Sequence, residues 1–149
     1  MILSSSDHKK VKKILQSFLE GNYLCVEIAS LLEDYITINF DSASEWREIR
    51  KNLLDGVFQI PVVEYYLTKM LHRYLDGKVT KNELSDWAAF IFLSQVYVPK
   101  GETEEERWLE GEGPIWDILQ RLMTPSVFGG FDEKVAQKYI DELEQNTSL

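Results

Sequence analysis

The chain has 149 residues, of which 44% are hydrophobic and 12% aromatic, and 25 acidic side chains outnumber 16 basic ones for a formal net charge of −9. This length fits one domain with an ordinary core, so we expect residues 1–149 to form a single domain. The composition is too apolar and aromatic for an intrinsically disordered protein. The acidic balance argues against a protein that binds the phosphate backbone of nucleic acid.

Membrane and secretory signals are missing from the sequence. No apolar run approaches the ~20 residues that a membrane span needs, and Met1–Lys13 lacks the apolar region of a signal peptide. The lone cysteine, Cys25, excludes an internal disulfide and a cysteine-based zinc site. We therefore expect a cytoplasmic protein with no membrane partner.

Apolar residues recur at helical spacing along most of the chain. In the first such segment, Val11–Leu19, they fall at i, i+3, i+4, i+7 and i+8, which is one stripe of a 3.6-residue period. A helix from about Ser44 would place Trp46, Ile49 and Leu53 inward. The same period predicts further helices over residues 24–35, 63–74, 84–92, 114–122 and 132–143.

Several predicted helices also carry terminal signals. Pro61 suits a first helical turn, where a missing N–H costs nothing. Thr80 and Glu83 have the spacing of a capping box, and Asp132 is a candidate N-cap of the last helix. Residues 124–130 form a turn-rich connection rich in glycine and proline.

Strand signals are weak by comparison. No segment sustains an alternation of period two, and Thr37–Phe40 could form at most a short extended piece. Residues 97–113 are an irregular acidic segment, with a loop around Pro99–Gly101 and at most a short helix near Glu104–Leu109. The sequence thus predicts an all-α bundle of about six to seven helices, built from helical hairpins, with little or no sheet.

One segment of the chain echoes another. Lys13–Gly21 and Lys69–Gly77 match at an offset of 56 residues, and each ends in an apolar pair, an acid and a glycine. Such a glycine can take the left-handed conformation that caps the last carbonyls of a helix. Each copy predicts a helical hairpin, and duplication and convergence on the same capping chemistry both remain open.

Catalytic and metal-binding patterns are scarce. The chain has two histidines, no Glu-x-x-His pair and no glycine-rich phosphate loop. A small enzyme would have to use His72 with Asp76 or Glu64. We interpret Cys25 as a small buried residue within a helix. We expect no catalytic residue, metal or cofactor.

The informative cluster is acidic. Gly101–Asp117 holds seven acids against one base, Arg107, with two tryptophans interleaved. Aromatic residues ringed by charge are typical of binding hot spots, and an acidic field steers a basic partner to the surface. The alternative is a solvated loop whose tryptophans pack inward. The candidate partner-binding residues are Glu104, Glu105, Glu106, Trp108, Glu110, Glu112, Trp116 and Asp117.

Three segments resemble a family of small acidic bacterial proteins. Tyr74-Leu-Asp-Gly-Lys-Val-Thr-Lys-Asn-Glu-Leu-Ser-Asp-Trp-Ala88 is similar to a Leu-Asp-Gly-x-Ile/Val-Thr-Arg-Glu-x-Val/Leu-Ser-x-Trp-Ala signature found among immunity genes of polymorphic toxin and contact-dependent inhibition systems. Pro114–Leu122 resembles the Ile-Trp-Asp-x-Leu-x-x-Leu segment that follows there, and Tyr139–Leu143 resembles the closing helix. The resemblance covers about half of the chain. Lys81, where arginine is usual, and the acidic insert after Pro99 depart from it.

The resemblance implies a non-catalytic protein that binds one cognate toxin and occludes its active site. It transfers no contact residue, because immunity surfaces are tailored to individual toxins. We therefore expect an immunity protein whose acidic surface around Glu104–Asp117 binds a basic toxin domain, such as a nuclease. The other hypotheses are a general adaptor or regulatory module that binds a partner helix, and the His72 enzyme.

Overall fold

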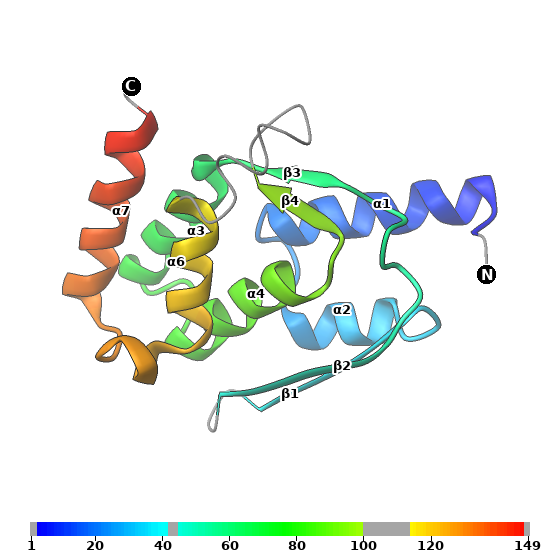
Figure 1. Ribbon diagram of the computed structural model, residues 1–149, viewed down its shortest axis with the longest axis horizontal. Helices are drawn as coiled ribbons and strands as arrows, with labels where there is room; N and C mark the ends of the chain where they lie inside the picture. Colours follow the sequence, from blue (N-terminus) through cyan, green and yellow to red (C-terminus); the bar gives the residue numbers. More distant parts are fainter. Residues whose placement is uncertain (1–2, 42–44, 100–113, 148–149) are drawn as a thin grey trace.

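The computed structural model describes residues 3–41, 45–99 and 114–147, and within them the chain is mostly helical with two small sheets (Figure 1). The sheets lie at opposite edges of the helical body in Figure 1, so the fold is mixed α and β. The all-α expectation is therefore wrong. The helices are α1 (Ser5–Leu19), α2 (Cys25–Leu31), α3 (Glu64–Leu75), α4 (Lys81–Leu93), α6 (Pro114–Met123), the 3-10 helix η1 (Pro125–Phe128) and α7 (Glu133–Thr147). The strands are β1 (Ile36–Asp41), β2 (Trp46–Asn52), β3 (Ile60–Val62) and β4 (Tyr97–Pro99).

Helix α4 is the central element. It is apolar around most of its circumference, and Leu84 and Trp87 through Ile91 are all buried, as expected of a helix enclosed by others. The Trp87 indole donates a hydrogen bond to the Phe18 carbonyl at 3.1 Å, and the Phe90 ring meets the Phe18 ring edge-on with centroids 4.9 Å apart. These contacts attach α1 to α4.

Most predicted helices and their caps are confirmed. Val11, Leu15, Phe18 and Leu19 are buried along α1. Thr80 and Glu83 form the predicted capping box at the start of α4. Asp132 accepts a hydrogen bond from the Val135 N–H at 3.0 Å, as an N-cap does. The spacing of apolar residues was sufficient to predict the helices that present one face to the core.

The helix expected from about Ser44 is wrong, because Trp46–Asn52 is strand β2. It pairs antiparallel with β1, and Ile38 lies opposite Ile49. Trp46 and Ile49 are an odd number of residues apart and so point to opposite faces of a strand. Accordingly Ile49 packs against the core, while Trp46 is 56% exposed. Leu53, expected inward, is also exposed.

A buried cation attaches this hairpin to α4. The Arg47 side chain is only 2% exposed, and its Nη2 lies 3.1 Å from Asp86 Oδ1 and donates to the Ser85 hydroxyl at 2.8 Å. The guanidinium also lies 5.5 Å from the centroid of the Phe40 ring. Burial raises the pKa of the Asp86 carboxyl, although Arg47 partly offsets this effect. A charged residue therefore takes an inward strand position that is usually apolar.

The prediction that Pro61 lies in the first turn of a helix is wrong, because this region belongs to the second sheet. This residue lies within β3, which pairs in parallel with β4, and α3 begins only at Glu64. The Tyr97 hydroxyl, on β4, donates to the Leu15 carbonyl at 2.7 Å. The parallel pair therefore brings the chain before α3 and the chain after α4 together beside α1.

The two echoing segments end in the same way. Gly21 and Gly77 have φ of 87° and 77°, the left-handed conformation predicted for them. Each N–H donates to the carbonyl three residues earlier, and the following N–H donates to the carbonyl five residues earlier. The next helices, α2 and α4, begin at Cys25 and Lys81, which keeps the offset of 56. The helix–glycine–helix arrangement is confirmed, whereas duplication stays a hypothesis.

These two glycines offer a matched pair of substitutions. A Cβ at Gly77 would meet no atom within 4 Å, whereas one at Gly21 would lie 2.5 Å from Arg73 Nη1. That Nη1 donates to the Gly21 carbonyl at 2.7 Å, so it cannot move without losing the bond. We expect Gly77→Ala to lower the free energy of unfolding by about 1 kcal/mol and Gly21→Ala by roughly twice as much, measured by urea denaturation. Equal losses would contradict the steric role of Gly21.

Loss of Asp86 and loss of Arg47 should lower the stability of the protein by different amounts. Arg47 cannot lose its proton, whereas a partly exposed Asp86 can gain one. We expect Asp86→Asn to lower the free energy of unfolding by about 3 kcal/mol and Arg47→Met to lower it less. The double variant should lose less than the sum of the two single losses, again in urea denaturation. Additive losses would mean that the pair is not coupled.

Candidate binding surface

Only two of the predicted partner-binding residues fall in the described part of the chain. Trp116 and Asp117 lie in the first turn of α6. The other six, which are Glu104, Glu105, Glu106, Trp108, Glu110 and Glu112, lie outside the described residues, as does the short helix expected near 104–109. The geometry of the candidate surface is therefore that of α6 and its neighbours.

Trp116 packs at the edge of the core. Its ring centroid lies 6.1 Å from that of Phe92, near the end of α4, and its side chain is partly buried. Helical spacing explains this position, because Ile115, Ile118 and Leu119 on the same helix are buried. Trp116 therefore contributes to the attachment of α6 to α4.

Asp117 belongs to a three-residue ionic bridge. Its Oδ2 lies 2.5 Å from Arg121 Nη2, and Arg121 Nη1 donates to Glu142 Oε2 at 3.2 Å. The guanidinium also lies 5.4 Å from the centroid of the Tyr139 ring. Partial burial alone would lower the pKa of Arg121, but Asp117, Glu142 and Tyr139 together outweigh burial and raise this pKa above its ordinary value. The bridge joins α6 to α7.

A shallow hollow of about 350 Å³ opens beside this bridge. Its polar part is the ionic bridge with Lys138, and its apolar part comes from η1 and α7. Gly129 and Gly130, at φ of 88° and 96°, turn the chain after η1, and Val127 and Phe128 before them are exposed. The lining residues are Asp117, Arg121, Phe128, Val135, Lys138, Tyr139 and Glu142.

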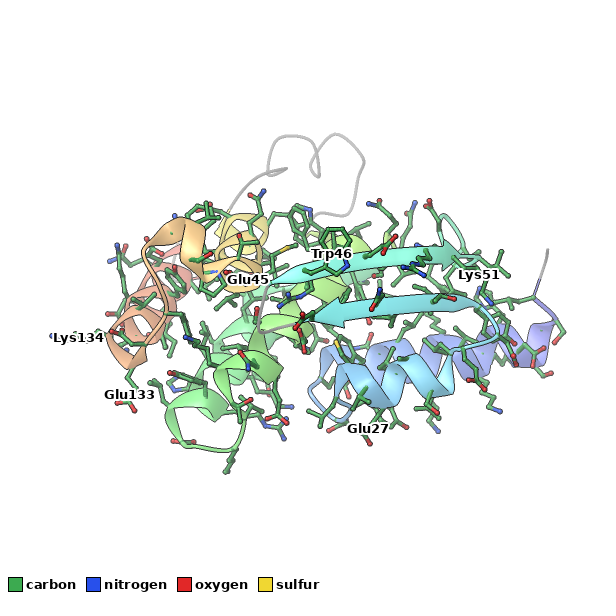
Figure 2. The ribbon with its side chains drawn as sticks, turned by 90° about the horizontal axis from the view of Figure 1, so that it is seen from below. Glu27, Glu45, Trp46, Lys51, Glu133 and Lys134 are labelled. Atoms are coloured by element: carbon green, nitrogen blue, oxygen red, sulfur yellow. The ribbon has the colours of Figure 1, made fainter. Side chains whose placement is uncertain are left out.

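A second hollow, of about 260 Å³, lies where the hairpin tip reaches η1. The Glu45 carboxylate accepts hydrogen bonds from the Ser126 N–H, at 3.2 Å, and from the Ser126 hydroxyl. Figure 2 shows Glu45 and Trp46 at the end of β2 next to α6, with Lys51 at the other end of the strand. Sequence reasoning missed this contact, because the two residues are 81 positions apart and neither has a distinctive local pattern.

Of the two carboxylates considered for catalysis with His72, Asp76 lies one helical turn away, its N–H donating to the His72 carbonyl at 2.9 Å, whereas Glu64 is distant. Glu64 is buried at the start of α3, and His72 is exposed two turns later, about 12 Å along the helix. The Cys25 thiol donates to the Asp86 carbonyl at 3.0 Å, and burial raises its pKa well above the ordinary value, so the thiolate is disfavoured. Among the described residues, no three His, Cys, Asp or Glu side chains form a group that could hold a metal ion.

Comparisons of the chain with protein-family models, with curated proteins and with solved structures give no match. Within the described residues, none of the helices is long and apolar enough to cross a membrane. Function therefore has to be argued from this chain's own residues.

Two tryptophans provide a test of which aromatic side chain supports the fold. We expect Trp116→Ala to lower the free energy of unfolding by about 2 kcal/mol, because its ring packs on Phe92. Trp46→Ala should cost less than about 1 kcal/mol, because that side chain is mostly exposed. Thermal or urea unfolding of both variants measures the difference. A larger loss for Trp46→Ala would contradict this assignment.

Proposed function

We propose that this chain is a non-catalytic, cytoplasmic immunity protein that binds a cognate toxin domain and occludes its active site. The observation that carries the proposal is the charge of Gly101–Asp117, where seven acids stand against one base. Like charges at helical spacing do not stabilise a helix, so the acids contribute no local stability, and we attribute their concentration to a partner. The family resemblance described above supplies the class of partner.

The described residues next to this segment suit a protein partner. Asp117, the last of the seven acids, lines the hollow beside the exposed Phe128. An apolar side chain next to charged groups is the usual composition of an interface. A toxin domain with a positively charged substrate groove, such as a nuclease, would be attracted to such a surface, because carboxylates can take the place of phosphates.

A test takes the genes that neighbour this one as the source of candidate toxin domains. We expect co-expression to restore growth to cells that make the toxin, and we expect the two proteins to form a complex. Reversal of Glu104, Glu105 and Glu106 to lysine should slow association by about tenfold or more at low salt, because an acidic field accelerates the encounter. Surface plasmon resonance at several salt concentrations measures this rate.

The matched control reverses three exposed acids of α7, which are Glu133, Asp141 and Glu144, and so changes the net charge equally. We expect this control to associate within about threefold of the unchanged protein at moderate salt, where long-range effects are screened. Equal effects of the two triple variants would remove the 104–117 surface from the proposal. Failure of the unchanged protein to protect against the toxin would remove the immunity function itself.

A further inference from the structure

The hollow beside the Asp117–Arg121–Glu142 bridge contains an aromatic ring that the fold leaves partly uncovered. Phe128 of η1 lines this hollow and is 46% exposed, although phenylalanine is among the residue types most often buried. Val135 and Tyr139 line it from α7, and Tyr139 is only 4% exposed. The ring of Phe128 is therefore the main aromatic surface that a ligand in the hollow would cover.

Contacts on both sides fix the backbone that carries Phe128. Before it, the Ser126 N–H and the Ser126 hydroxyl both donate to the Glu45 carboxylate. After it, Phe131 is buried, and its ring centroid lies 4.9 Å from that of Tyr74 on α3. In Figure 1 this stretch is the orange segment that joins α6 to α7. The backbone is thus positioned before a partner binds, which lowers the entropic cost of binding.

The charged rim of the hollow is electrically balanced. Two carboxylates and two cations line it, so their formal charges sum to zero: Asp117, Glu142, Arg121 and Lys138. Arg121 already bridges both carboxylates. A charged side chain from a partner would lose its hydration here without gaining a net attraction from the rim. The balance of charge therefore favours a neutral occupant.

The rim also contains a hydrogen-bond acceptor that a purely aliphatic occupant would leave without a partner. The Asp117 side chain is 42% exposed, and among the described residues only its Oδ2 has a partner, which is Arg121. An apolar group over the other oxygen would displace its water and replace no hydrogen bond, which costs free energy. An indole N–H or a phenol O–H can donate to this oxygen while the ring packs against Phe128.

We propose that this hollow, named the Phe128 hollow, binds a tryptophan or tyrosine side chain of the partner protein. Its volume of about 350 Å³ lies near the lower limit of small-molecule sites, which suits one side chain better than a larger ligand. Tryptophan and tyrosine are also among the residues that most often dominate the binding energy of an interface. The inference rests on the proposed function, because it gives the toxin domain an anchor residue beside the acidic segment that would attract its basic surface.

The first test needs no toxin. Its probes are N-acetyl-tryptophanamide, N-acetyl-leucinamide and the cationic N-acetyl-argininamide, each titrated into isotope-labelled protein and followed by NMR. We expect the tryptophan probe to shift the amide signals of the residues that line the hollow. The leucine and arginine probes should bind at least about threefold more weakly, because neither brings an aromatic ring. Equal binding of the leucine probe, or tighter binding of the arginine probe, would overturn the choice of occupant.

Two neighbouring residues of η1 make the variants a matched pair. Val127 is 73% exposed and does not line the hollow, whereas Phe128 does. We expect Phe128→Ala to abolish the shifts caused by the tryptophan probe, and Phe128→Leu, which keeps the bulk but not the ring, to weaken them. Val127→Ala should leave them unchanged. Urea denaturation checks that all three variants are folded, and equal loss of the shifts in Phe128→Ala and Val127→Ala would contradict the Phe128 hollow.

The second arm uses the toxin domain and separates the two proposals. We expect Phe128→Ala to raise the dissociation rate of the complex about tenfold or more and to leave the association rate within about twofold. If the unchanged protein protects cells and Phe128→Ala binds the toxin as tightly, the Phe128 hollow is wrong and the immunity function stands. If the unchanged protein gives no protection while binding of the tryptophan probe still depends on Phe128, the hollow stands as an aromatic-binding site on a protein of another function.

Discussion

The fold depends on the enclosure of helix α4. A helix that is apolar on nearly all sides can only be stable if other elements cover each side, and the described contacts show how this is done. Trp87 binds the carbonyl end of α1, Phe92 meets Trp116 of α6, and Asp86 meets both Arg47 of the hairpin and Cys25 of α2. The side chain of Asn52 donates to the Ser94 carbonyl at 2.8 Å, just after the helix. Four separate elements are thus positioned by one helix.

Enclosure also carries an electrostatic cost, which is concentrated at the hairpin. Arg47 is almost fully buried, and its Nε has no hydrogen-bond partner among the described residues. Burial outweighs the attraction of Arg47 in setting the raised pKa of Asp86, so the pair adds little net stability. What the pair provides is position, because the contacts of the buried guanidinium with Asp86 and Ser85 hold β2 across α4. Glu45, two residues before Arg47, then meets Ser126.

The acidic side chains are not distributed evenly along the chain but are clustered. The segment Gly101–Asp117 holds seven acids against one base and interleaves them with two tryptophans. An interface built on this segment would steer a cationic partner from a distance and then exclude water around its aromatic side chains. Trp116, within that segment, also packs α6 onto α4 through the Phe92 ring.

The sequence by itself determined the helices that present one face to the core, their caps at Thr80 and Asp132, and the left-handed glycines at 21 and 77, because these depend on neighbours within one or two turns. The sequence also predicts β1 more strongly than the short extended piece expected for Thr37–Phe40, because Ile36, Ile38 and Phe40 alternate with polar residues over six positions. Only the tertiary structure decided β2, because one of its inward residues is Arg47, whose partner lies 39 positions away at Asp86. The same holds for the contact of Glu45 with Ser126 and for the exposure of Phe128. Local periodicity shows which residues of a segment share a face. Only the folded chain determines which of those faces is covered by other elements and which stays exposed to solvent.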